Sequence, residues 1–280
     1  KKQIASLEPL ANLQKGYFFI LDQERGIIIE LDNYKIPIWS ISKEDMDMKS
    51  INRVFRLDNK NTMILDKENN TLVEISPKGR ESWKYEPEDE YSKLNNPSAY
   101  TILAENEILV ADTDNHRIFE AHLDGEIIWE YGEKGKPGDN FNFLNFPTDI
   151  QKTYDGTYLI TDSGNNRVIE LKREMNIETA QYEIKVLFEY NEGFNNPIQA
   201  YKEIDGKVLV LDKGNNRLVT VDNQHGLLWE FNMSKLDDTY KITNPQNFLR
   251  LKNKDILVVG DGKVIEILPN ENEGGKILWS

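Results

Sequence analysis

The sequence contains no cysteine, so disulfide bonds, thiolate nucleophiles and cysteine-ligated zinc are excluded. Histidine is scarce as well, with three residues at positions 116, 122 and 225. No apolar run approaches the roughly 20 residues of a membrane-spanning helix, and we therefore expect no membrane insertion. These absences limit the nucleophiles and metal ligands that the chain can offer.

Positive charge is also in deficit. Lys and Arg number 34 against 48 Asp and Glu, which gives a net charge of −14 at pH 7. Proteins that bind nucleic acid draw much of their affinity from Lys and Arg that neutralise phosphates. Anionic membrane surfaces likewise attract basic segments. We therefore expect no nucleic-acid partner.

The sequence does contain a repeat of 44 to 50 residues, marked by an Asp that closes a short apolar run at Asp22, Asp66, Asp112, Asp162 and Asp212. In four copies a Trp follows this Asp by 17 residues, at Trp39, Trp83, Trp129 and Trp229. In the fourth copy the matching aromatic is Phe188, 26 residues after the Asp, so this copy carries nine additional residues. In a sixth copy Gly260 takes the Asp position and Trp279 ends the pattern.

Each copy contains four short segments with a period of two, separated by turn residues, which is typical of β-strands. Four strands per repeat match the blade of a β-propeller, in which neighbouring sheets bury each other's faces. We therefore predict an all-β, six-bladed β-propeller with four antiparallel strands per blade, forming a single domain over residues 1–280. The first strand is expected near Leu7, and the first and last blades are expected to pack together. The predicted blades span residues 6–49, 50–95, 96–145, 146–195, 196–243 and 244–280.

The turn after the repeated Asp carries a recognisable motif, Asp112-x-x-Asn115-x-Arg117, which recurs from Asp162 and from Asp212. Together with the glycine-rich segment 132–147, this motif resembles the NHL-repeat β-propeller family. Asp124-Gly125 followed by Trp-Glu-Tyr at 129–131 is also similar to arylsulfotransferase-like propellers. The resemblance implies the fold but no single function, because such propellers include protein-binding, RNA-binding and enzymatic members. It favours an extracytoplasmic or cell-surface location, as does a first residue other than Met, while a cytoplasmic location stays open.

Features that recur in every blade are interpreted as structural. Asp and Asn side chains bond to nearby backbone in tight turns, and the Arg of the motif can pair with the turn Asp. The Trp and Phe residues are expected to fill the gaps between blades. The third strand carries a glutamate in five blades, for which we expect partners in the neighbouring blade or at the rim: Glu30, Glu74, Glu120, Glu170 and Glu266, with Thr220 in the fifth blade.

Positions where the residue type changes from blade to blade are better candidates for a binding site. The position 13 residues before the repeated Asp lies near the start of each first strand, close to the axis, and holds Pro9, Arg53, Ala99, Asp149 and Gln199, with Asn247 in the sixth blade. We predict that Arg53, Asp149, Gln199 and Asn247 surround the channel mouth and bind a ligand. Arg53 would contact a carboxylate, sulfate or phosphate group. The alternative is an Arg53–Asp149 ion pair with ordered water in the channel.

One histidine is a candidate for acid–base chemistry. His116 lies in a turn on the face where propellers bind ligands, whereas His122 lies in a strand and His225 is expected on the opposite face. We predict no cofactor. The acidic pairs Asp112-x-Asp114 and Asp237-Asp238 could help to hold Ca²⁺, but no complete calcium-loop spacing is present and no site is predicted.

The leading functional interpretation is a non-catalytic binding propeller. The loops between blades differ most, with an acidic segment at 86–91 and an aromatic segment at 132–146. Loops on a rigid scaffold often carry binding, so we expect a protein, peptide or glycan on that face of a monomeric domain. The alternative is an enzyme of the lyase, lactonase or sulfotransferase kind that uses His116 with Arg53 and Asp149. A third interpretation is a spacer in a larger cell-surface protein.

Overall fold

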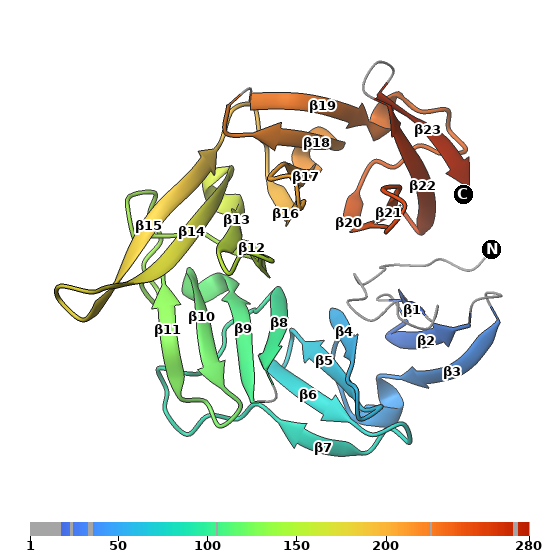
Figure 1. The fold of residues 1–280 in the computed structure, drawn as a ribbon. Helices are drawn as coiled ribbons and strands as arrows, with labels where there is room; N and C mark the ends of the chain where they lie inside the picture. The colour runs from blue at the N-terminus through green and yellow to red at the C-terminus, as the bar shows by residue number, and fades with distance from the viewer. Residues whose placement is uncertain are drawn as a thin grey trace.

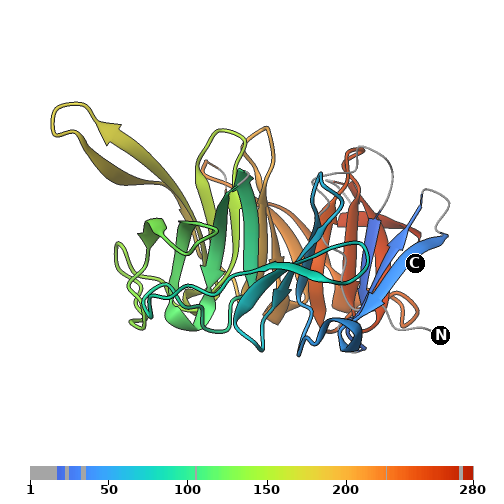
Figure 2. The same ribbon diagram turned by 90° about the horizontal axis from the view of Figure 1, so that it is seen from below.

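The computed structural model describes residues 18–22, 25–32, 36–104, 106–224, 226–270 and 274–279. Six antiparallel sheets stand around a central axis, and the fold is an all-β, six-bladed propeller (Figure 1). The predicted fold is therefore confirmed. The first and last sheets are neighbours in the ring, in the view along the axis and in the view from the side (Figures 1 and 2).

The strands follow the chain from blade to blade. Blade 1 comprises β1 (Phe18–Asp22), β2 (Ile27–Leu31) and β3 (Pro37–Ser42); the strand expected near Leu7 lies outside the described residues. Blade 2 comprises β4 (Arg53–Arg56), β5 (Thr62–Asp66), β6 (Thr71–Ile75) and β7 (Glu81–Lys84), and blade 3 comprises β8 (Ala99–Ala104), β9 (Glu107–Asp112), β10 (Arg117–His122) and β11 (Ile127–Tyr131).

Blade 4 comprises β12 (Pro147–Lys152), β13 (Tyr158–Asp162), β14 (Arg167–Asn176) and β15 (Gln181–Tyr190). Blade 5 comprises β16 (Pro197–Lys202), β17 (Val208–Asp212), β18 (Arg217–Asp222) and β19 (Gly226–Asn232). Blade 6 comprises β20 (Pro245–Arg250), β21 (Ile256–Gly260), β22 (Lys263–Asn270) and β23 (Gly274–Trp279). We call the strands of each blade A to D, from the axis outward; β1 is strand B of blade 1.

The register explains the constant spacing between the repeated Asp and the Trp. In every blade a β-bulge separates the strand-C glutamate, or Thr220, from the next residue where strand C pairs with strand D. The strand-D aromatic lies directly opposite that residue, as in the pair Glu120 and Trp129. The nine additional residues of the fourth copy extend β14 and β15 beyond this point, so the glutamate and the aromatic stay paired as Glu170 and Phe188.

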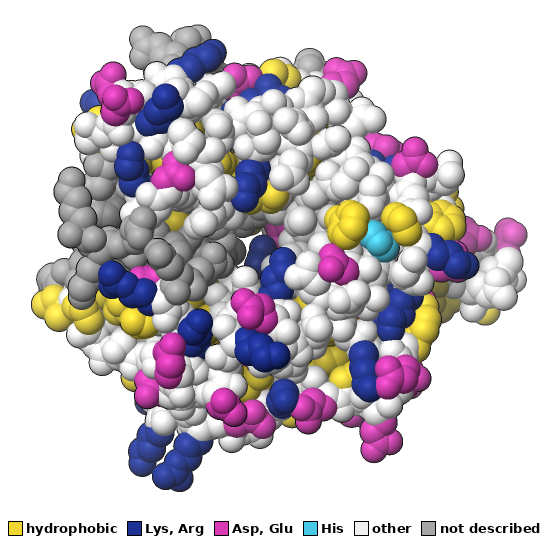
Figure 3. Space-filling model, turned by 180° about the vertical axis from the view of Figure 1, so that it is seen from behind, with side chains coloured by type: hydrophobic (Ala, Val, Ile, Leu, Met, Phe, Trp, Pro, Cys, Tyr) yellow, Lys and Arg dark blue, Asp and Glu magenta, His cyan; other side chains and the backbone are white. Residues whose placement is uncertain are grey.

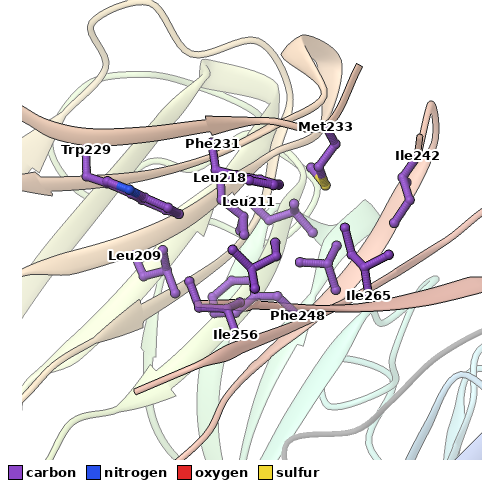
Figure 4. Close-up of a cluster of buried hydrophobic side chains, with 12 residues drawn as sticks. Leu209, Leu211, Leu218, Trp229, Phe231, Met233, Ile242, Phe248, Ile256 and Ile265 are labelled. Atoms are coloured by element: carbon purple, nitrogen blue, oxygen red, sulfur yellow. The ribbon is translucent and has the colours of Figure 1, made fainter. Parts of the chain in front are cut away.

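The hydrophobic core lies between the blades. Strand B is buried along its whole length in blades 2, 4 and 5, because neighbouring sheets cover both of its faces. Between blades 5 and 6, Leu209, Leu211 and Trp229 face Phe248 and Ile256 across the seam (Figure 4). Trp229 is buried, and it therefore has the packing role that the sequence predicts.

The two faces of the propeller carry different connections. One face, here called the loop face, holds the D–A loops and the B–C turns, and the opposite hairpin face holds the A–B and C–D turns. The β14–β15 hairpin projects from the body on the hairpin face (Figure 2). In the part of the chain that the structure describes, no helix has the length and apolar character needed to cross a membrane.

Candidate functional site

The repeated Asp fastens the loop face of blades 3, 4 and 5 through the same set of contacts. Asp112 accepts hydrogen bonds from the Asn115 amide at 2.8 Å and from Arg117 Nε at 2.9 Å. Its second oxygen accepts from the backbone N–H of Asn95, in the loop that enters the blade, at 2.7 Å. Asp162 and Asp212 repeat all three contacts with their own Asn, Arg and loop amide. These motif residues therefore have the structural role that the sequence predicts.

His116 occupies a place that asparagine holds in other blades. Its backbone is left-handed, with φ of 56°, as is that of Asn70 and Asn166 at the matching turn position. His116 Nδ1 accepts from the backbone N–H of Phe146 at 3.2 Å, and Asn70 and Asn166 accept the equivalent bond through Oδ1 at 2.6 and 2.7 Å. Burial lowers the pKa of His116, while Asp114 and Asp162 act in the opposite direction. Both the bond and the lowered pKa favour a neutral imidazole.

The His116 ring also packs against an exposed aromatic. Its centroid lies 4.5 Å from that of Phe146 in an edge-to-face arrangement. A catalytic role for His116 stays a prediction, and such a role would have to use Nε2 because Nδ1 is engaged. His122 lies at the end of β10, as expected for a strand residue. His225 lies outside the described residues.

The structure brings two of the predicted channel residues together. Arg53 on β4 and Asp149 on β12 form an ion pair, with the guanidinium 2.7 Å from the carboxylate. Blade 3 stands between them and has Ala99 at the matching position, a side chain too short to reach the axis. The register places these residues at the same level, since each is opposite the strand-B residue that precedes the repeated Asp or its equivalent. The structure therefore contains the Arg53–Asp149 ion pair of the alternative interpretation.

The other predicted channel residues differ from each other. The Gln199 amide spans to blade 6, accepting from the Phe248 N–H at 2.8 Å and donating to the Phe248 carbonyl at 3.2 Å. Asp149 accepts in the same way from the Ala200 N–H at 3.3 Å. Asn247 is buried, and among the described residues its Oδ1 has no hydrogen-bond partner. A position that varies in residue type therefore repeats one contact to the next blade in blades 4 and 5.

The loop face around blades 3 and 4 carries exposed aromatic side chains, which we call the aromatic patch: Tyr91 is 46 % exposed, Phe141 63 % and Phe146 45 %. Figure 3 shows this face, with hydrophobic side chains gathered beside a histidine and basic side chains beside the central opening. Both phenylalanines lie in the aromatic segment 132–146 that the sequence predicts as a binding loop, and Tyr91 is the last residue of the acidic segment 86–91.

Ordered contacts hold the patch in place. Tyr91 Oη donates to Glu130 at 2.5 Å, which raises the pKa of the tyrosine, and its ring lies 4.9 Å from the Arg117 guanidinium. Lys134 Nζ donates to the Tyr91 carbonyl at 2.9 Å. The Phe141 ring meets Tyr131 edge to face, with centroids 6.2 Å apart. The aromatic rings are therefore presented by a scaffold that already fixes their positions.

The described residues contain no group of three or more His, Cys, Asp or Glu side chains arranged to hold a metal ion. Strand A also carries a set of cations that was not predicted, three residues after Arg53, Asp149, Gln199 and Asn247. Its members pair with glutamates of the preceding blade, as Arg56 does with Glu30 at 2.6 Å. The signal was present in the sequence, because Arg56, Lys152, Lys202 and Arg250 keep a constant spacing to the repeated Asp or its equivalent.

No family model and no curated protein matches the sequence, so the resemblance to NHL repeats stays a prediction. Solved structures do match. A streptogramin B lyase shares 15% identity with a TM-score of 0.66, over 100% of this chain and 83% of that one. A catalytically inactive histidine-to-alanine variant of virginiamycin B lyase from Staphylococcus aureus, with quinupristin, shares 15% identity with a TM-score of 0.64, over 96% and 82%.

The neighbours also include a propeller from a different functional class. The WD40 propeller domain of Doa1 shares 10% identity with a TM-score of 0.63, over 94% of this chain and 77% of that one. Identities this low show the fold alone. The chain is therefore similar to enzymatic and to WD40 propellers.

Proposed function

We propose that this protein is a non-catalytic binding propeller that holds an extended peptide of a partner protein on its loop face. The observation that carries the proposal is the aromatic patch of Tyr91, Phe141 and Phe146. Exposed aromatic side chains with few rotatable bonds supply large contact area at a small entropic cost, and they are enriched among binding hot spots. A patch that is already ordered needs little rearrangement when a partner binds.

The charge of the residues around the aromatic patch indicates which kind of peptide would bind. Glu130 accepts the hydrogen bond of the Tyr91 hydroxyl, and the acidic segment 86–90 directly precedes Tyr91, in a chain with a net charge of −14. Such a surface attracts neutral or basic peptides more readily than acidic ones. The proposed partner segment is therefore apolar or aromatic with basic flanks.

The channel mouth has a smaller part in this proposal. A ligand at Gln199 would have to replace two hydrogen bonds to Phe248, and one at Asp149 would compete with Arg53. Asn247 is the better candidate for contact with a partner side chain that enters the channel, because Arg53 is held by the same ion pair as Asp149. Asn247 Oδ1 could accept a hydrogen bond there.

Selection from a phage-displayed peptide library tests the proposal. We expect selected peptides to bind the wild type and to lose at least about tenfold in affinity, about 1.4 kcal/mol, against a Phe141→Ser, Phe146→Asn double variant. Asn is chosen at 146 because Asn96 and Asn196 adopt the same left-handed backbone at the matching position. The matched control is Tyr182→Ser with Ile204→Ser, which removes two exposed apolar side chains from the β14–β15 hairpin and the A–B turn of blade 5.

Peptides that bind the double variant as tightly as the wild type would show that the patch is not the binding surface. If the control variant lost the same affinity for the selected peptides, binding would reflect exposed apolar surface in general and not the aromatic patch. Failure to select any peptide above background would also contradict the proposal.

A second candidate is an enzyme of the lyase, lactonase or sulfotransferase kind. Its support is the similarity to lyases of the same fold, one of which is inactive as a histidine variant, together with His116 on the loop face. Incubation with quinupristin, followed by chromatography, tests the lyase form of this candidate. Conversion by the wild type but not by His116→Asn would support it, and unchanged quinupristin would remove it.

A further inference from the structure

The seams between blades carry a repeated ion pair on the hairpin side of the core. In three of the described seams, the strand-C glutamate of one blade meets a cation on strand A of the next blade. The pairs are Glu30–Arg56 at 2.6 Å, Glu120–Lys152 at 3.1 Å and Glu170–Lys202 at 2.6 Å. Each glutamate has its countercharge supplied from within the protein.

The seam between blades 2 and 3 lacks this cation. Ile102 occupies the position: it lies opposite Ile108 as Lys152 lies opposite Tyr158, and each of these strand-B residues comes four residues before the repeated Asp. Glu74 is still present on β6. Its Oε1 accepts from the amides of Asn61 at 2.5 Å and Asn59 at 3.3 Å, and these donors carry no net charge. Among the described residues, no cation forms an ion pair with Glu74.

A cavity of about 630 Å³ opens at this same seam. Phe55, Met63 and Ile102 supply apolar walls, and Glu74 and Asp58 supply carboxylates. The described lining includes no Lys, Arg or His. Its size falls within the range of roughly 300–1,000 Å³ that is typical of small-molecule pockets. The missing cation and the empty volume thus occur together.

A second interrupted seam gives the contrast. Between blades 5 and 6 the carboxylate is missing instead, because Thr220 replaces the strand-C glutamate, and a cavity of about 590 Å³ includes Thr220 and Arg250 in its lining. The cation at this seam has a different partner, because Arg250 forms an ion pair with Glu203 at 2.6 Å. The Arg250 charge at the blade 5–6 seam is therefore compensated, whereas Glu74 at the blade 2–3 seam has amide donors and, among the described residues, no ion-pair partner.

We propose that the cavity between blades 2 and 3 binds an organic amine, a small molecule with a cationic head and an apolar body. The ammonium group would take the place that Lys152 and Lys202 hold at the seams with an ion pair and would bond to Glu74. The apolar body would pack against Phe55, Met63 and Ile102. Charge-assisted hydrogen bonds are stronger than those between neutral groups. This site is separate from the aromatic patch and does not depend on the proposed peptide.

Calorimetry with phenethylamine and its uncharged analogue phenethyl alcohol tests the assignment on the wild-type protein. We expect the amine to bind and the alcohol to bind at least about tenfold more weakly, since only the amine can replace the missing cation. Equal affinity for the two compounds would overturn the proposal. Absence of amine binding at millimolar concentration would overturn it as well.

Two variants then locate the site. Glu74→Gln keeps the shape and removes the charge, and Ile102→Lys supplies the cation that the other seams contain; we expect each to weaken amine binding at least about tenfold. Glu81→Gln is the matched control, because it removes a carboxylate from the exposed strand β7 of the same blade and should leave affinity unchanged. Amine affinity that is unaltered in Glu74→Gln, or reduced equally in Glu81→Gln, would show that binding is not at this cavity. Thermal unfolding of each variant separates loss of the site from loss of the fold.

Discussion

The loop face and the hairpin face of this propeller follow different rules. On the loop face of blades 3, 4 and 5, the same Asp, Asn and Arg make the same contacts in each blade. On the hairpin side, the glutamate–cation pair recurs in three of the described seams and is broken in two. Where the pair is broken, the seam holds a cavity.

The difference teaches how function can arise in a repeat protein. A contact that recurs from blade to blade has a structural role, because the stability of a repeat protein is the sum of contacts within its repeats and between neighbouring repeats. A blade that departs from the repeat leaves a charge or a volume without its usual partner. Departures from the repeat, rather than the repeat itself, are therefore the places to look for a ligand.

The largest expected effect comes from breaking the loop-face network where it is most buried. The Arg117 side chain is 0% exposed and bonds to Asp112, Glu130 and the Tyr91 carbonyl. Arg117→Ala would leave Asp112 buried without its cation, and we expect a loss of about 3–5 kcal/mol in the free energy of unfolding. Urea denaturation measures it.

Arg217→Ala provides the matched comparison for this prediction. Arg217 makes the same pair with Asp212, but its side chain is 15% exposed, so water can replace part of the lost contact. We expect a smaller loss. If the two variants were equally destabilised, burial would not be what makes the blade 3 motif stronger.

A smaller effect is expected at the seams that contain the glutamate–cation pair. Lys202 Nζ bonds to Glu170 at 2.6 Å and to Asp155 at 2.9 Å, and the Glu170 side chain is 6% exposed. Lys202→Met should cost about 1.5–3 kcal/mol, the usual range for hydrogen bonds to charged groups. Lys152→Met should cost less, because Glu120 keeps a second cation, Arg173 at 3.9 Å, in addition to the hydrogen bond from Tyr158 Oη at 2.8 Å. Urea denaturation of both variants checks the order, and a greater loss in Lys152→Met would contradict it.

Much of the fold was predictable from the sequence because the repeat imposes it. The constant interval from Asp to Trp follows from a β-bulge that recurs beside the strand-C glutamate, and the fourth copy keeps this pairing despite its insertion. Pattern analysis detects such spacing directly. The partners of the glutamates could not be named, since a pair such as Glu170 and Lys202 depends on how two sheets pack and not on either strand alone.

The candidate site was less predictable for the same reason. Variation at the channel position suggested a ligand, yet Asp149 and Gln199 both use their side chains to bind the backbone of the next blade. A carboxylate and an amide can accept the same hydrogen bond, so different residue types can do one structural task. A comparison of the blade sequences gives the residue type at each position, but it does not give the hydrogen bond that the residue makes.

His116 presents this equivalence in its most testable form, with the smallest expected effect. Its pKa lies below the ordinary value of 6.5, mainly because the ring is buried, so the folded state binds fewer protons than the unfolded state. The stability from neutral His116 is therefore present above pH 6.5 and is lost as the pH falls through that value toward the lower, folded-state pKa.

His116→Asn places the residue of blades 4 and 5 at this turn, where it can accept a hydrogen bond from the Phe146 N–H without titrating. At about pH 7.5 we expect the variant to differ from the wild type by less than about 1 kcal/mol. Between about pH 7.5 and 5 the wild type should lose more stability than the variant, as measured by urea denaturation at each pH. If the free energies of unfolding of the two proteins changed in parallel with pH, protonation of His116 would not be coupled to the loss of this hydrogen bond.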